Sequence, residues 1–384
     1  MTLKFTAAVL ALAFAGLAHA APPADPKMVE LWSRMDEYHA ARGVKKPDAP
    51  RELKRAAPSP EIDKLVDAFM DAHANTGLLV LKGDTVLAER YQYGRTPGHR
   101  LGSASVAKTV LGMLVGIAVS EGRLKLEDRV AQYLPDLVNH PYGDNTVRDL
   151  LTMSSGVGDG TPAHRVRDEG AKLINNTLWQ KTEGGVDTIR EFEWRDAAPG
   201  TRFKYASADS QVLGLVLAFA VKQPLAEYLS DKIRRPMGAE AHATWLVDKG
   251  GFETGYCCIN AVLRDYGRFG MLLANYGALD GKQIIPAEWV KAATRPSAKH
   301  LEVGTATPNN GYGYQTWILG SRPRAGGDPV LSDRFAALGV HGQAIFIDPS
   351  RKLVVVHTAV WAEGDDRAER GAQFRFFEDV LKVL

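Results

Sequence analysis

The sequence predicts an α+β fold in which both ends of the chain contribute strands to one antiparallel sheet, with a helical subdomain inserted between them. Two β-hairpin patterns lie near the two ends, at residues 77–90 and 343–358. The residues between them, from about 105 to 280, follow mostly helical spacing. Because paired strands must meet in space, the two ends should come together and flank a helical insertion.

The composition is that of an ordinary globular protein. Of the 384 residues, 45% are hydrophobic and 24% are charged, which argues against a disordered chain or a multispanning membrane protein. The formal net charge is only +2, with 47 Lys and Arg against 45 Asp and Glu. This balance gives no electrostatic signature for nucleic acid or for anionic lipid, so we expect neither partner.

The first twenty residues predict a signal peptide. Lys4 supplies a positive charge, an apolar run follows from Ala7 to Ala18, and small residues Ala18 and Ala20 flank His19 at the expected cleavage site. The alternative is a short membrane-tethering helix, but no cluster of basic residues follows the run. We therefore expect an exported chain, periplasmic or secreted, with no stable membrane insertion after cleavage.

Residues 21–60 hold seven of the 20 prolines and predict a linker or loosely attached extension, with a short helix around Met28 to Ala41. The regular pattern, and with it the main domain, begins at residue 61 and continues to residue 384. A helix is expected first, because apolar residues recur at helical spacing: Ile62, Leu65, Val66 and Phe69.

The strands of the sheet come next. Residues 77–81 and 86–90 flank Lys82-Gly83-Asp84, which is a hairpin pattern. Residues 343–348 and 352–358 flank a second turn in the same way, and a final helix is expected over residues 365–383.

Ser105 is the candidate nucleophile. It begins a helix whose residues 106–117 are almost all apolar, apart from Lys108 on the same face of the first turn. Burial and the positive end of the helix dipole should both lower the pKa of this lysine, as a base acting on a serine requires. The helix-end amides favour an oxyanion near Ser105. The alternative is a capping serine followed by a lysine that extends to solvent.

These residues form an S-x-x-K motif, and the chain resembles the serine β-lactamase and penicillin-binding-protein superfamily, in which that motif marks the acylated serine. The resemblance covers residues 61–384 and is greatest to the class C-type branch, which includes 6-aminohexanoate-dimer hydrolases and family VIII-type carboxylesterases. It extends to residues 146–156, to a helix at residues 263–270, and to residues 312–317, which are expected to form a strand. The resemblance implies the β-lactamase/transpeptidase-like fold.

The second motif of that branch, Tyr-x-Asn, has its counterpart within residues 199–207. The resemblance makes Tyr205 the phenol that relays protons between Ser105, Lys108 and the leaving group. Ser207 replaces the asparagine, which is more similar to the esterases and oligomer hydrolases than to true β-lactamases. The alternative for Tyr205 is an ordinary core tyrosine.

The third motif, Lys-Thr-Gly, aligns with Ala337-Leu338-Gly339, so its lysine and threonine are both absent. In the family those side chains help to bind the substrate carboxylate, which puts penicillin and cephalosporin hydrolysis in doubt. Gly339 would keep the close backbone approach, and the Val340 amide would join the Ser105 amide as oxyanion donor. His341 contacts substrate or is structural; the sequence favours neither.

The sequence lacks the motifs of metal-dependent and nucleotide-dependent enzymes. No H-E-x-x-H pattern or clustered Cys/His spacing predicts a metal site, and no nucleotide-binding loop predicts a cofactor. Asp136, Asp149 and Asp265 are expected at helix ends or in salt bridges. The only cysteines, Cys257 and Cys258, could form a strained ring disulfide, but we expect two buried free thiols.

The function predicted from these motifs is an exported serine hydrolase that cleaves small ester, amide or peptide-like substrates through a Ser105 acyl-enzyme. The alternatives are a β-lactamase or D-amino-acid-specific peptidase, and a non-catalytic homologue that binds cell-wall fragments. The loop from Val157 to Gly170 is expected to border the site.

Overall fold

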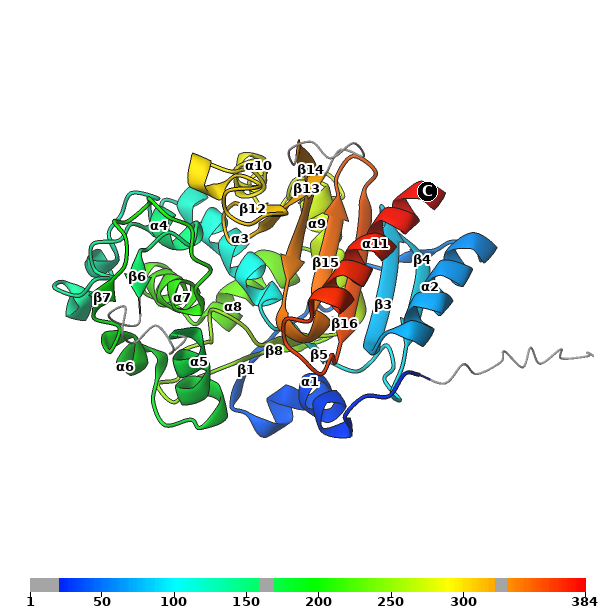
Figure 1. Cartoon of the computed structure of the whole chain (residues 1–384), viewed down its shortest axis with the longest axis horizontal. Coiled ribbons are helices and arrows are strands. Elements are labelled where there is room, and N and C mark those ends of the chain that lie inside the picture. The colour runs from blue at the N-terminus through cyan, green and yellow to red at the C-terminus, as the bar shows by residue number, and fades with distance from the viewer. Residues whose placement is uncertain (1–20, 159–168, 322–329) are drawn as a thin grey trace, which may run out of the picture.

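The computed structural model describes residues 21–158, 169–321 and 330–384. The predicted signal peptide and most of the loop expected to border the site lie outside the described residues. The α+β prediction is confirmed, with a large antiparallel sheet at one end of the molecule and a mainly helical region at the other (Figure 1).

The large sheet has eight strands in the order β12-β13-β14-β15-β16-β3-β4-β2. All neighbours are antiparallel except β2 and β4, which run parallel at the edge. Both predicted hairpins are present, and β3 of the first pairs with β16 of the second, with Leu78 opposite His357. The strands are β2 (Lys54–Arg55), β3 (Asn75–Lys82), β4 (Thr85–Tyr91), β12 (Asn310–Tyr312), β13 (Trp317–Ser321), β14 (Val330–Leu338), β15 (Ala344–Asp348) and β16 (Leu353–Ala359).

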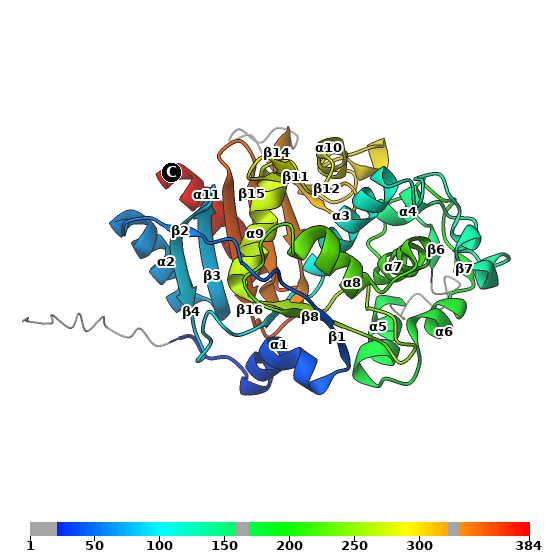
Figure 2. The ribbon, with the colours of Figure 1, turned by 180° about the vertical axis from the view of Figure 1, so that it is seen from behind.

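Helices cover both faces of this sheet. The predicted helices α2 (Pro60–Ala72) and α11 (Arg367–Val383) pack together on the face seen in Figure 1, where Phe69, Phe346 and Phe376 share one apolar cluster. Helix α9 (Leu263–Ala274) lies on the opposite face, as Figure 2 shows from behind. The sheet is therefore buried on both sides, which explains its continuous apolar strands.

Helix α3 (Val106–Ser120) lies at the centre, between the sheet and the helical region (Figure 1). As the sequence predicts, it is buried along almost its whole length. Gly116 lets the Trp289 ring lie against the helix, because a Cβ at that position would stand only 2.2 Å from the ring. The Trp289 indole N–H also donates to the Gly112 carbonyl at 3.0 Å, so the nucleophile helix is held from the side.

The helical region and the connections use the remaining elements. They are η1 (Val130–Gln132), η2 (Pro135–Leu137), α4 (Val147–Leu151), β6 (Val157–Gly158), α5 (Glu169–Ile174), η4 (Asn175–Trp179), α6 (Gly185–Arg190), β7 (Trp194–Arg195), α7 (Ser207–Val221), α8 (Leu225–Leu229), η5 (Ser230–Arg234), β10 (Ala278–Leu279), β11 (Lys282–Gln283), α10 (Ala287–Ala293), η6 (Lys299–Leu301) and η7 (Val340–Gly342). Within the described residues, no single helix is long and apolar enough to cross a membrane. Two neighbouring helical segments, Ser207–Val221 and Leu225–Arg234, are together long and apolar enough, but they meet at a bend of 77°.

A second, four-stranded sheet interrupts the region that the sequence predicts as mainly helical. Its order is β1-β8-β9-β5, formed by β1 (Ala41–Val44), β8 (Ala243–Leu246), β9 (Ile259–Ala261) and β5 (Leu101–Gly102). Its first strand comes from the proline-rich segment, whose helix α1 (Pro26–Tyr38) packs on β5, β8 and β9. Residues 26–55 are therefore paired and packed against the body of the protein, so the expected linker or loosely attached extension is wrong for them.

Two expectations are wrong. Residues 312–317 do not form a strand: β12 ends at Tyr312, β13 begins at Trp317, and the segment between them turns, with Gln315 at φ +52°. Cys257 and Cys258 are not free thiols but are joined by a disulfide. The cysteines are buried as expected, so burial was correctly predicted and the oxidation state was not.

The three aspartates are placed as expected. Asp149 accepts from the Thr146 backbone N–H in a capping box at the start of α4. Asp136 pairs with Arg190, and Asp265 is buried between two arginines.

Candidate active site

Ser105 occupies the N-cap position of α3 without a side-chain capping hydrogen bond, and it follows a strained turn. Ala104 is buried and has φ +43°, in the left-handed region that is unfavourable for a residue with a Cβ. Ser103, one residue earlier, is tied to β9 twice: its N–H donates to the Ile259 carbonyl at 2.8 Å, and its hydroxyl accepts from the Ile259 N–H at 2.9 Å. The turn that presents Ser105 is therefore fixed to the small sheet.

Lys108 lies one turn along α3 and contacts Ser105 directly. Its Nζ is 2.9 Å from Ser105 Oγ and donates to the Tyr256 carbonyl at 2.7 Å. The side chain is only 1% exposed, and this burial lowers the pKa of the amine from 10.5 to about 7. A neutral amine that already donates to Tyr256 has its lone pair available for the serine proton.

Tyr205 approaches the same pair from the segment before α7. Its ring centroid is 5.1 Å from Lys108 Nζ. Burial raises the pKa of the phenol, although 36% of the side-chain surface stays exposed, and a hydrogen bond with the Ser105 hydroxyl opposes this rise. The phenol therefore stays protonated near neutral pH and has a proton to give.

Main-chain contacts on both sides fix the position of Tyr205. The Lys204 N–H donates to the Met153 carbonyl at 2.9 Å, and the Ala206 N–H points at the Met153 sulfur at 3.4 Å. Ser207 is the first residue of α7, two positions further on, and is half-buried.

Gly339 lies against the nucleophile turn. A Cβ at this position would stand 2.9 Å from the Ser105 nitrogen, the Ser103 carbonyl oxygen and the Ala104 Cβ, so only glycine fits without displacement. Gly339 follows the last residue of β14, and Val340 comes next with 37% of its surface exposed. The structure thus brings Gly339, directly after β14, against the backbone nitrogen of Ser105.

The His341 side chain contacts Trp361 and Trp32. Its Nδ1 is 2.7 Å from the Trp361 carbonyl oxygen, and its ring packs on Trp32 of α1 at 5.2 Å between centroids. The backbone of His341 has φ +56°, and its N–H donates to the Gly364 carbonyl at 2.8 Å. These contacts give the residue a structural role beside Val340.

Three contributors at the site were not predicted. The Tyr256 carbonyl acts through the main chain, so its side-chain identity gives no signal. The Arg370 guanidinium, from α11, donates to the Gly339 carbonyl at 2.5 Å. The Trp317 ring stacks on Tyr205 at 5.2 Å between centroids; the resemblance covers Trp317 only as the end of segment 312–317, with no role at the site.

Among the described residues, no cluster of possible metal ligands lies around Ser105. Across residues 21–158, 169–321 and 330–384, no three His, Cys, Asp or Glu side chains lie close enough to hold a metal ion together. The constellation is one of serine, amine, phenol and backbone amides, which is suited to acyl transfer.

Comparison with known proteins agrees with this chemistry. A family model described as Beta-lactamase matches residues 62–377. The 6-aminohexanoate-dimer hydrolase of Paenarthrobacter ureafaciens is 27% identical over 313 residues, which cover 80% of this chain and 78% of that protein.

Two solved structures share the fold. One from Bacillus anthracis, assigned as a 6-aminohexanoate-dimer hydrolase, superposes with a TM-score of 0.81 at 24% identity and covers 93% of this chain and 94% of its own. A family VIII carboxylesterase gives a TM-score of 0.64 at 18% identity, over 86% of this chain and 99% of its own. With the family model matching most of its length, the chain belongs to the β-lactamase family of serine hydrolases.

Proposed function

We propose that this protein hydrolyses ester or amide bonds of small substrates through an acyl-enzyme on Ser105. The observation that carries the proposal is the 2.9 Å contact between Ser105 Oγ and the buried Lys108 amine. A serine hydroxyl is a weak nucleophile until a base removes its proton, and this amine titrates near neutral pH.

The reaction begins when Lys108 accepts the Ser105 proton and Oγ attacks the substrate carbonyl carbon. The tetrahedral oxyanion is stabilised by the backbone N–H groups of Ser105 and Val340. Tyr205 gives its proton to the leaving group and is reprotonated from Lys108, which leaves an acyl-serine. Water then attacks the acyl carbonyl and gives one proton to Lys108, which passes it to Ser105 Oγ as the C–O bond breaks and the carboxylic acid leaves.

The absence of the third-motif lysine supports weakly charged substrates. Ala337 and Leu338 stand where the family has the lysine and threonine that help to bind a carboxylate, so these positions supply no cation. The face beside Tyr205 is aromatic: Tyr205 stacks on Trp317, and Tyr312 packs edge-on to both rings. Such a wall favours an apolar acyl or leaving group over an anionic one.

The test is a panel of nitrophenyl esters, short linear amides that include the 6-aminohexanoate dimer, and β-lactams, with mass detection of the adduct on Ser105. We expect ester or amide turnover and a covalent adduct in the parent, and neither in Ser105→Ala. Equal ester hydrolysis by Ser105→Ala would refute the proposal. Turnover confined to β-lactams would instead assign a β-lactamase.

Export is the remaining part of the proposal, and it rests on Lys4 and the apolar run that follows. We expect cells to process the chain after Ala20 and release a mature protein that begins at Ala21. Mass measurement of the protein from a periplasmic or culture fraction tests this, and a full-length chain found only in the cytoplasm would contradict it.

A further inference from the structure

The adjacent cysteines lie between two main-chain contacts, one to Lys108 of α3 and one to the turn that presents Ser105. On one side, the Tyr256 carbonyl accepts from Lys108 Nζ at 2.7 Å. On the other side, the backbone of Ile259 exchanges two hydrogen bonds with Ser103. The Cys257–Cys258 disulfide joins the two middle residues of this four-residue segment and so restricts the backbone that connects the two contacts.

We propose that the Cys257–Cys258 disulfide is a positioning element that holds the Tyr256 carbonyl against the amine of Lys108. This inference rests on the proposed function, because it concerns the base of that reaction. A disulfide between neighbouring residues closes a small ring through their shared peptide, which leaves that part of the main chain little torsional freedom.

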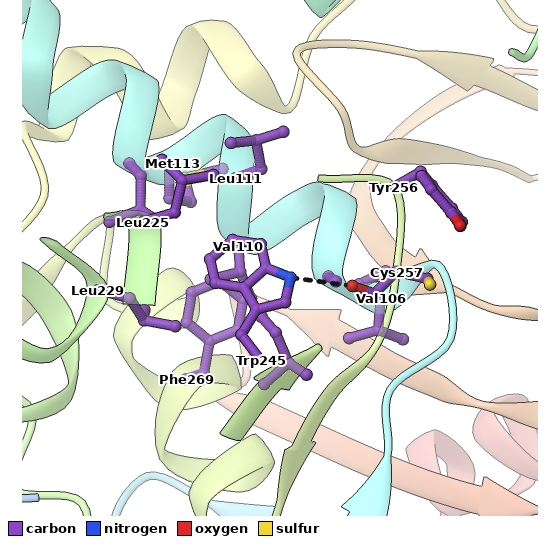
Figure 3. Close-up of a cluster of buried hydrophobic side chains, with 14 of the residues drawn as sticks. Val106, Val110, Leu111, Met113, Leu225, Leu229, Trp245, Tyr256, Cys257 and Phe269 are labelled. Carbon is purple, nitrogen blue, oxygen red and sulfur yellow. Dashed lines mark hydrogen bonds between the residues drawn. The ribbon is translucent and has the colours of Figure 1, made fainter. Parts of the chain in front are cut away.

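The backbone of the ring needs such a restraint. Cys258 has φ +76°, which is unfavourable for a residue with a Cβ. Its carbonyl accepts from the Leu246 N–H at 3.1 Å, and the Cys257 carbonyl accepts from the Trp245 indole N–H at 3.0 Å. Figure 3 shows this indole pointing at the Cys257 backbone beside Val106 of α3. Relaxation of Cys258 towards negative φ would turn the peptides on either side of it.

The consequence for Lys108 follows from the chemistry of its nitrogen. When neutral, the amine directs its lone pair at Ser105 only if its N–H groups donate to other acceptors. The Tyr256 carbonyl accepts from one of them. Among the residues that the structure describes, the titratable groups facing Nζ are the phenols of Tyr205 and Tyr256, with ring centroids at 5.1 and 5.8 Å. A displaced carbonyl would leave the amine buried but misdirected, and would remove an acceptor that favours the ammonium form.

The test compares the parent with Cys257→Ser/Cys258→Ser in steady-state ester hydrolysis over a range of pH. We expect kcat to fall at least about tenfold, with KM changed by less than about threefold, because misdirected catalytic groups reduce the rate of the chemical step. The acidic limb of the kcat/KM profile should move to lower pH. Thr177→Val is the matched control: it removes the partner of the Tyr256 hydroxyl, 2.7 Å away, and leaves the main chain intact, so kcat and the acidic limb should stay unchanged.

A second measurement uses the parent chain itself, in case the double variant does not fold. A water-soluble phosphine breaks the S–S bond to give two thiols, and is oxidised to the phosphine oxide with oxygen from water. We expect kcat to fall on reduction and to recover on reoxidation, with the change followed by mass. An unchanged kcat and acidic limb in the variant or in the reduced parent would overturn the proposal, and so would two free thiols in freshly isolated active enzyme. Labelling of the parent at Ser105 by a fluorophosphonate separates these outcomes from failure of the proposed function, in which the parent itself would not react.

Discussion

Replacing Lys108 by methionine should lower catalytic activity, because the base is lost, and should raise the free energy of unfolding. Without the amine, kcat/KM should fall by roughly 10²- to 10⁴-fold. Burial in the folded protein holds the pKa of this amine at about 7, against the ordinary lysine value of 10.5. At about pH 7 this pKa difference lowers the parent's free energy of unfolding by roughly 4 kcal/mol. Lys108→Met removes that penalty, but the loss of two hydrogen bonds offsets about half of the gain. The free energy of unfolding of Lys108→Met should therefore be roughly 2 kcal/mol higher than the parent's.

The pH dependence of this gain is the sharper part of the prediction. Between pH values near 7 and 10.5, the unfolded chain binds a proton at Lys108 that the folded chain has released, so the parent becomes more stable as pH rises. Lys108→Met lacks this linkage. Its advantage in the free energy of unfolding should therefore shrink by roughly 2 kcal/mol between about pH 7 and about pH 9.

Denaturant unfolding of both proteins at the two pH values measures this change. Lys125→Met, which makes the same change of side chain at an exposed position, is the control. A gap between the parent and Lys108→Met that is the same at both pH values would refute the argument that burial depresses the amine's pKa.

Three further predictions concern other residues. Tyr205→Phe keeps the stacking on Trp317 but removes the proton relay, so kcat should fall by roughly 10²- to 10⁴-fold while the free energy of unfolding changes by less than about 1.5 kcal/mol; a kcat within threefold of the parent's would contradict this role. Gly339→Ala places a Cβ 2.9 Å from the Ser105 nitrogen, so fluorophosphonate labelling should slow by about 10²-fold, whereas Gly364→Ala, whose nearest contact would be an ordinary 3.5 Å, should label normally. His357 is buried, neither ring nitrogen has a hydrogen-bond partner among the described residues, and burial lowers its pKa from 6.5 to about 3. The parent should therefore lose stability as pH falls from about 6.5 towards 3, and His357→Leu should remove that loss, by about 2 kcal/mol near pH 5 in thermal or denaturant unfolding; equal acid sensitivity of both proteins would argue against it.

The elements predicted most closely are those with strong local patterns. The hairpin strands and the buried helix after Ser105 are encoded by runs of apolar residues with turn residues between them, and they appear where expected. The segment from Tyr312 to Trp317 was expected to form a strand as part of the family resemblance, and that expectation was wrong. Its path is set instead by tertiary contact: a Cβ on Gly313 would stand 2.0 Å from the Ala293 carbonyl oxygen, so the chain must turn there against α10.

The residues of the candidate site also fall into those that the sequence predicts and those that it does not. The proximity of Ser105 and Lys108 follows from helical spacing alone, and the approach of Tyr205 and Gly339 was expected only from the family resemblance. The Tyr256 carbonyl and the Arg370 contact to Gly339 could not be predicted, because one is a backbone group and the other joins residues that meet only in the folded chain.

The pairing of β3 with β16 has a consequence for how the molecule is made. Leu78 lies opposite His357, so strands near the start of the domain acquire their central neighbour only after almost the whole chain has been synthesised. Pairing between such distant segments is slow, since the entropy of closing a long loop must be lost before the contacts form. Until then the inner edge of β3 has no partner, and the apolar strands of the first hairpin can associate with other chains. A ribosome-bound fragment that ends before residue 353 should therefore depend on chaperones far more than the finished protein does.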